Sequence, residues 1–153
     1  VIRELSLRKE LWGDTGARDE NGITDAFIAG ITRAVLSTKT AYKWEVFEKA
    51  AKLSDELIFG IDLDDGIISP SEEVRNMSVR EIIREGVDLG IDTFVIADLS
   101  EGRFKRRTLD MLPEGNYRVY VGGVAEERID DLNHPNLSGF ILSLKEAIKY
   151  KKN

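Results

Sequence analysis

Aspartates end two apolar runs of this chain, in positions where a carboxylate suits acid/base catalysis. The run at 57–61 ends in Asp62, and the run at 93–97 ends in Asp98. The carboxyl ends of parallel strands are where α/β folds carry their chemistry. Asp62 and Asp98 are therefore the candidate catalytic residues, with Asp62 the stronger. The competing interpretation of Asp62 is a helix cap or an ion pair with a nearby lysine.

Glycines and hydroxyl residues end other apolar runs and favour anion binding. At Gly122-Gly123 the backbone N–H groups are free to approach a phosphate, because no Cβ stands in the way. A following helix near Ser143 would add the attraction of its positive end. Gly16 with Thr38 and Lys39 would form a second anion site across the same rim. The alternative for Gly122-Gly123 is a plain tight turn.

The elements that must position these residues alternate between strand-like and helix-like periods. Helical patterns separate the apolar runs, and Ser78 with Glu81 predicts a capping box at the start of one helix. Alternation of this kind implies a parallel sheet covered by helices. Polar residues at the ends of all the runs favour a barrel mouth over an open sheet, in which one or two loops would carry the site. The expected strands are 11–14, 33–37, 57–62, 93–98, 117–121 and 139–143.

Composition limits the class of protein. The 153 residues suit one domain, and the net charge of −6 with scattered basic residues argues against nucleic-acid binding. No apolar run is long enough to cross a membrane, and no signal peptide is apparent. The absence of cysteine excludes disulfides and thiolate metal sites. We expect a cytoplasmic protein with no metal or cofactor, and the high charge is weakly typical of a thermophile.

Four strand ends resemble those of the histidine-biosynthesis barrels, namely the phosphoribosylformimino-aminoimidazole-carboxamide ribotide isomerase and the cyclase subunit of imidazole glycerol phosphate synthase. The resemblance begins at the family's third strand and covers nearly the whole chain. It predicts a single domain over 1–153, a partial TIM-type (β/α) barrel with units three to eight present. The segments that carry it are Asp14-Thr15-Gly16-Ala17-Arg18-Asp19, Val35-Leu36-Ser37-Thr38-Lys39-Thr40, Ile61-Asp62-Leu63-Asp64-Asp65-Gly66 and Val121-Gly122-Gly123-Val124.

The resemblance implies a phosphorylated small-molecule ligand and an isomerase-like reaction. In that family the aspartate that corresponds to Asp62 serves as general acid, and an aspartate on the first strand serves as base. The resemblance also implies two phosphate sites across the barrel mouth, at Gly122-Gly123 with Ser143 and at Gly16 with Thr38-Lys39.

Several departures from the family pattern leave activity open. The first two strands and their aspartate have no counterpart, and Ala97 stands where the isomerase has a threonine that assists catalysis. The last strand end, Ser143-Leu144-Lys145, replaces a Gly-rich loop. Six parallel strands leave two unpaired edges. We therefore expect a longer chain or self-association to cover them.

Two alternatives remain. One is a catalytically silent binding or assembly module, which the missing partner aspartate and the open edges favour. The other is a magnesium-dependent phosphatase, because an apolar strand followed by Asp62-Leu63-Asp64 resembles the Asp-x-Asp motif of the haloacid-dehalogenase-type enzymes. In that motif the first aspartate attacks phosphorus and the second acts as acid/base.

Overall fold

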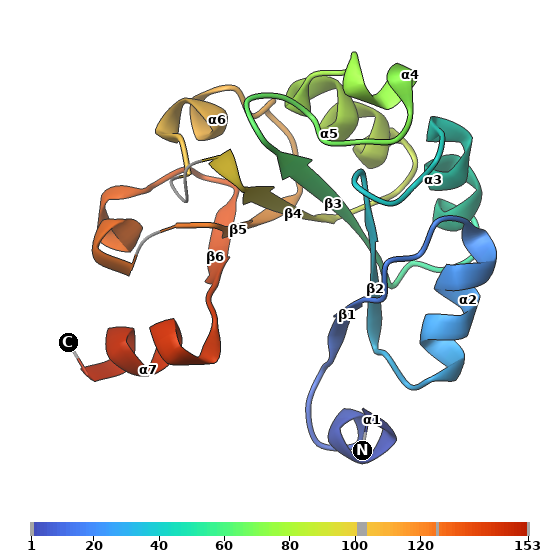
Figure 1. Ribbon diagram of the computed structural model, residues 1–153, viewed down its shortest axis with the longest axis horizontal. Coiled ribbons are helices and arrows are strands. Elements are labelled where there is room, and N and C mark those ends of the chain that lie inside the picture. The colour runs from blue at the N-terminus through green and yellow to red at the C-terminus, as the bar shows by residue number, and fades with distance from the viewer. Residues whose placement is uncertain (1, 101–103, 125, 153) are drawn as a thin grey trace.

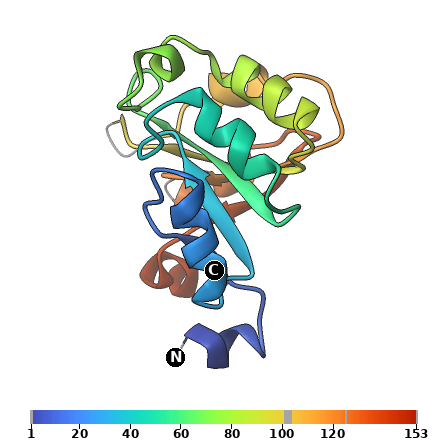
Figure 2. The same ribbon diagram turned by 90° about the vertical axis from the view of Figure 1, so that its right-hand side faces the viewer.

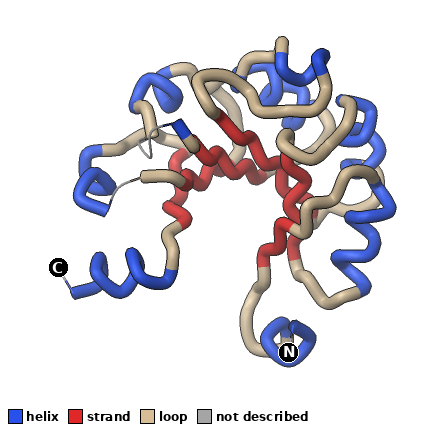
Figure 3. Tube along the Cα trace, viewed as in Figure 1, coloured by secondary structure: helices blue, strands red, loops and turns tan. Residues whose placement is uncertain are grey.

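The computed structural model describes residues 2–100, 104–124 and 126–152, and its sheet is a curled half-barrel. Six parallel strands pair in chain order, each with the next, and the sheet bends into an arc (Figures 1 and 3). The fold predicted from the sequence, a partial TIM-type barrel with six of eight units, is confirmed. The strands are β1 (Trp12–Asp14), β2 (Arg33–Ser37), β3 (Leu57–Leu63), β4 (Thr93–Asp98), β5 (Arg118–Gly122) and β6 (Leu137–Ile141).

Helices follow the strands, and those from α2 to α6 lie on the convex side of the arc (Figure 1). The predicted capping box is present: Ser78 accepts from the Glu81 backbone N–H and Glu81 accepts from that of Ser78, so α5 begins where expected. The helices are α1 (Ile2–Ser6), α2 (Glu20–Ile28), α3 (Trp44–Ala51), α4 (Glu72–Arg75), α5 (Val79–Asp88), α6 (Arg106–Asp110), the 3-10 helix η2 (Glu126–Asp131) and α7 (Leu144–Lys152).

Figure 2 shows helices lying over one face of the sheet, and the buried apolar side chains form one cluster that includes residues of these helices and of the strands. A row of aromatic rings crosses it: Phe47 meets Phe59 at 4.9 Å between centroids, and Phe59 meets Phe94 at 6.0 Å. Phe94 in turn lies 5.7 Å from Tyr117. Edge-to-face pairs of this kind add to the free energy gained by burying the rings. The row therefore ties α3, β3, β4 and the start of β5 into one layer.

The concave face is closed at the amino ends of the strands by a buried arginine. Arg33 on β2 donates to Thr93 Oγ1 and to Asp92 Oδ1, each at 3.0 Å. Its guanidinium also lies 5.7 Å from the ring centroid of Trp12. Trp12 meets Tyr120 of β5 at 4.7 Å, so side chains from the two arms of the arc touch across the concave side. These side chains occupy the concave face toward the amino ends of the strands.

The last strand differs from its predicted position by two residues. The expected strand was 139–143, whereas β6 is Leu137–Ile141 and its register against β5 shifts between Val119 and Tyr120. Ser143 lies outside the strand because it caps α7, with its hydroxyl accepting the Glu146 N–H at 3.3 Å. A local capping interaction therefore ends the strand earlier than the apolar run suggests.

The two sheet edges are the least buried strands. All residues of β2 and β3 are buried, whereas β1 and β6 are mostly half-buried or exposed. In Figure 1 the chain ends face one another across the gap in the arc. The edges of β1 and β6 thus border the opening of the half-barrel.

In the described part of the chain, no helix is long and apolar enough to cross a membrane.

Candidate functional site

A cavity of about 370 Å³ lies inside the arc at the carboxyl ends of the strands. Every strand contributes to it, so residues far apart in the chain share one space. Its walls are largely apolar, with a few polar groups converging on the opening, which is typical of small-molecule sites. The lining residues are Trp12, Asp14, Val35, Ser37, Gly60, Ile61, Asp62, Val95, Ala97, Gly122 and Ile141.

Asp62 is the buried carboxylate of this cavity. It is 8% exposed and accepts a hydrogen bond from the Ser37 hydroxyl, which comes from the neighbouring strand. Its backbone N–H donates to Thr38 Oγ1 at 3.0 Å. These contacts fix the carboxylate at the meeting point of β2 and β3, on the concave side. The geometry suits a group that must present one oxygen to a bound molecule.

The predicted second anion site contains two loops that the structure does bring together. Thr40 Oγ1 donates to the Ala17 carbonyl at 2.7 Å, so the loop after β2 touches the loop after β1. Gly16 has φ +69°, and its N–H donates to Asp14 Oδ1 at 3.0 Å. Lys39 is exposed beside them. Thr38, in contrast, is fully buried, and its hydroxyl holds the backbone of Asp62.

The two adjacent glycines at the end of β5, Gly122 within the strand and Gly123 after it, have different surroundings. Gly123 has φ +80°, and a Cβ built there would lie 2.2 Å from the Asp98 carbonyl oxygen. Packing against β4 and backbone conformation therefore both require glycine at position 123. A Cβ at Gly122 would meet nothing closer than 3.8 Å, and Gly122 lines the cavity. The plain-turn interpretation accounts for Gly123, whereas the missing side chain of Gly122 leaves room for a ligand.

Ser143 lies near Gly122, because Gly122 pairs with Ile141 in the sheet. Its backbone N–H donates to Glu146 Oε2 at 2.8 Å. Hydrogen bonds from the side chain and the backbone of Ser143 hold the pKa of Glu146 below its usual value. The start of α7 is thus at the predicted rim, but its capping groups are already paired within the helix.

Asp98 lies apart from Asp62. In the register of β3 with β4, Asp62 pairs with Ala97 and Leu63 pairs with Asp98, and only Asp62 and Ala97 line the interior cavity. Asp98 is 2% exposed, and its carboxylate accepts the Ser100 N–H at 3.0 Å and the Lys105 N–H at 3.3 Å. The two predicted catalytic carboxylates are therefore not brought together, and Asp98 organises the loop that follows β4.

Two cavity residues with a carboxylate or hydroxyl group were not singled out from the sequence as site residues. Ser37 contacts the Asp62 carboxylate, and Asp14 places a second carboxylate on the lining, at the end of β1. Both stand in polar strand-end segments, so the signal was present. What the sequence lacks is the pleat phase, which decides which of two adjacent polar residues faces inward. Among the described residues, no three histidine or carboxylate side chains converge in a metal-binding group.

Comparison with known proteins relates the chain to a protein family and to a curated relative. Residues 2–133 match the family described as "Histidine biosynthesis protein". A 103-residue stretch is 25% identical to 1-(5-phosphoribosyl)-5-((5-phosphoribosylamino)methylideneamino) imidazole-4-carboxamide isomerase of Caulobacter vibrioides. That stretch is 65% of this chain and 42% of the relative. The matched region thus spans about two fifths of the curated relative's length.

Proposed function

Because the chain belongs to the histidine biosynthesis protein family, we propose that it binds a phosphoribosyl or other sugar-phosphate ligand at the carboxyl ends of its strands, with Asp62 as acid/base. The observation that carries this proposal is the buried Asp62 carboxylate, held by Ser37 inside a cavity to which all six strands contribute. A cytoplasmic location is part of the proposal.

Phosphate binding is assigned to the rim around this cavity. On one side, Gly122 leaves space beside the exposed backbone of Gly123. On the other, Gly16 and the exposed Lys39 lie on loops joined through Thr40. Backbone N–H groups and a lysine ammonium are both suited to phosphate oxygens. Two such sites would hold a ligand that carries phosphate at both ends.

Asp62 has a candidate partner in Asp14, which lines the same cavity from the end of β1. Asp14 is exposed whereas Asp62 is buried, so their environments differ. Two carboxylates on one cavity wall can both take part in proton transfer at a bound ligand. We assign proton transfer at the ligand to Asp62, with Asp14 as the second carboxylate.

The test is turnover of the Caulobacter relative's named substrate, together with calorimetric binding of ribose 5-phosphate. Asp62→Asn should abolish turnover and leave ribose 5-phosphate binding within about threefold, since the phosphate contacts are elsewhere. Asp64→Asn is the matched control, because Asp64 is exposed and does not line the cavity. Normal turnover by Asp62→Asn would contradict the proposed role.

A catalytically silent binding module is the second candidate, and Ala97 favours it. Ala97 pairs with Asp62 in the register of the sheet, and its methyl side chain offers no group for catalysis at the position next to the carboxylate. Binding of ribose 5-phosphate without turnover by the wild-type protein would select this candidate. The Asp-x-Asp phosphatase is supported less, because only the first of its two aspartates lines the cavity.

We propose in addition that a second copy of the chain covers the open edges of β1 and β6. Unpaired strand edges expose rows of N–H and C=O groups that readily pair with another chain. Large apolar side chains are also exposed on the segments next to both edges, including Leu7 at 87% and Leu144 at 78%.

A further inference from the structure

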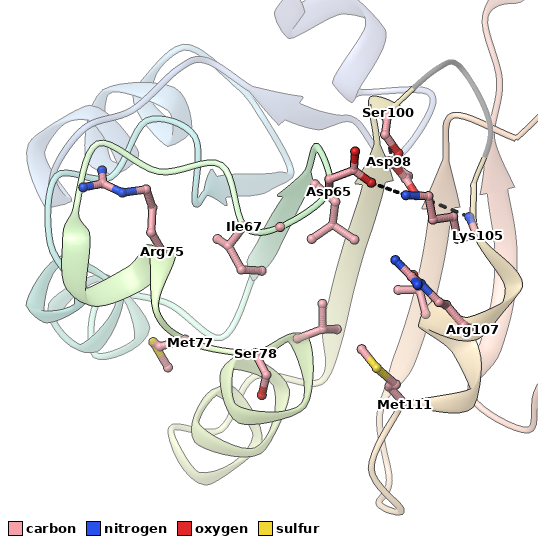
Figure 4. Close-up of a pocket in the computed structure, with 14 residues that line it drawn as sticks. Asp65, Ile67, Arg75, Met77, Ser78, Asp98, Ser100, Lys105, Arg107 and Met111 are labelled. Atoms are coloured by element: carbon pink, nitrogen blue, oxygen red, sulfur yellow. Dashed lines mark hydrogen bonds and ion pairs between the residues drawn. The ribbon is translucent and has the colours of Figure 1, made fainter.

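A second cavity, of about 210 Å³, lies outside the half-barrel between the loop after β3 and helices α5 and α6 (Figure 4). Leu63 and Asp98, which pair in the sheet, form its base. They belong to the opposite pleat phase from Asp62 and Ala97, which line the interior cavity. The two cavities thus lie on opposite faces of the same two strands. The outer one has room for on the order of seven waters, enough for a small organic molecule.

The floor of this outer cavity is apolar. Leu63, Ile67 and Val79 line it and are each less than 10% exposed. Met77 and Met111 complete the apolar surface, and Met111 is 44% exposed at the opening. Methionine side chains are flexible and polarisable, so they adapt to the shape of a bound group. The floor therefore suits a branched or cyclic hydrocarbon body.

Among the residues that the structure describes around the opening, Arg107 is the cation directed inward. Lys105 is already paired with Asp65, and the pKa of Asp65 is held below its usual value by the hydrogen bond from Lys105. Arg75 donates to the Ser69 carbonyl at 2.7 Å, and its guanidinium points away from the middle of the cavity. Arg107 points between Asp65 and Met111 in Figure 4. Its guanidinium is the group available to an incoming anion.

We propose that the outer cavity binds a small organic carboxylate, a monoanion whose charged end pairs with Arg107 and whose apolar body lies on Leu63, Ile67 and Met111. The planar guanidinium matches a carboxylate through two parallel hydrogen bonds. The inward guanidinium of Arg107 balances one negative charge. The apolar floor distinguishes this ligand from inorganic phosphate, which has no hydrocarbon to bury.

The two methionines of the chain both line this cavity, so they report on it directly. Protein labelled with carbon-13 at the methionine methyl groups gives two signals, one for each. Titration with isocaproate should shift both signals to saturation, whereas uncharged isocaproamide and inorganic phosphate should leave them in place. Arg107→Gln should weaken isocaproate binding about tenfold, as expected for loss of a charge-assisted hydrogen bond.

Arg106→Gln is the matched control, because Arg106 is an exposed neighbour on the same helix that does not line the cavity. It should bind isocaproate as the wild type does, and so should Asp62→Asn, since Asp62 faces the other cavity. The proposal is overturned if isocaproate moves neither signal, if the amide or phosphate acts equally well, or if Arg107→Gln binds normally. Unchanged methionine signals without ligand would show that each variant is folded.

Discussion

Gly122 and Gly123 are adjacent, but the structure gives them different reasons to be glycine. At Gly123 a side chain would collide with the Asp98 carbonyl and would require a positive φ. At Gly122 a methyl group would contact Ala97 and Ile141 at ordinary distances, on the wall of the interior cavity. Gly123 is thus needed for folding, whereas Gly122 leaves space on the wall of the cavity.

Alanine substitutions should separate the two roles. Gly123→Ala should lower the free energy of unfolding by roughly 3 kcal/mol, from strain and overpacking. Gly122→Ala should change it by less than about 1 kcal/mol. It should nevertheless weaken ribose 5-phosphate binding about tenfold, because the methyl group takes up space at the rim. Urea unfolding and calorimetry measure the two effects, and equal destabilisation by both variants would contradict this division.

For single residues, the sequence identified strand-end carboxylates better than it predicted which face of the sheet they lie on. Asp62 was identified as a strand-end carboxylate, and the structure places it in the interior cavity. Asp98 has the same pattern, an apolar strand followed by aspartate, yet it lies in the opposite pleat phase. Which phase faces the concave side depends on pairing with neighbouring strands. Nothing within either segment encodes that choice.

Among the elements, strand positions followed from the sequence because each buried run is bounded by polar residues and glycine. The run at 33–37 became β2 with the same limits. The prediction for the last run was wrong at its end, since Ser143 caps α7 and the strand ends at Ile141. A helix cap and a strand terminus compete for the same few residues, and the apolar pattern alone does not decide between them.

The joint between α6 and β5 depends on Tyr117, which is 5% exposed. Its hydroxyl donates to the Pro113 carbonyl, and its ring packs on Phe94. Burial raises the pKa of Tyr117 to about 12. The neutral phenol is therefore favoured in the folded protein, and ionisation favours the unfolded chain, whose tyrosines titrate near pH 10. The stability that Tyr117 provides is complete below about pH 10 and is lost as the pH rises toward 12.

Comparison with Tyr117→Phe isolates this dependence from the other groups that titrate at high pH. At pH 8 the wild type should be more stable by about 1 kcal/mol, the usual value of one hydrogen bond. Above pH 10 that difference should shrink and then reverse, because the phenylalanine variant has no phenol to ionise. Urea unfolding at a series of pH values measures it. A difference that is constant across the range would show that Tyr117 ionises equally in both states.

The molecule as a whole has a closed convex side and an open concave side. Helices from α2 to α6 cover the outside of the arc, while the edges of β1 and β6 border the gap (Figure 1). A closed barrel of this type has eight strands, and closure removes both edges. Six strands reach far enough to form the cavity and its rim. They leave two strands whose outer backbone groups have no sheet partner within the described chain.

A two-fold axis along the strands would pair β6 of each copy with β1 of the other and keep all strands parallel. Light scattering after size-exclusion chromatography should then give a mass of two chains, which falls toward the mass of one chain on dilution. Leu144→Asp and Ile148→Asp should each shift the equilibrium toward one chain, because Leu144 and Ile148 are exposed on α7 beside β6. Ile28→Asp on α2 is the matched control. Ile28 is 64% exposed, but α2 lies on the convex side of the arc, away from the open edges. A mass of one chain at every concentration, or equal effects of all three substitutions, would exclude pairing through these edges.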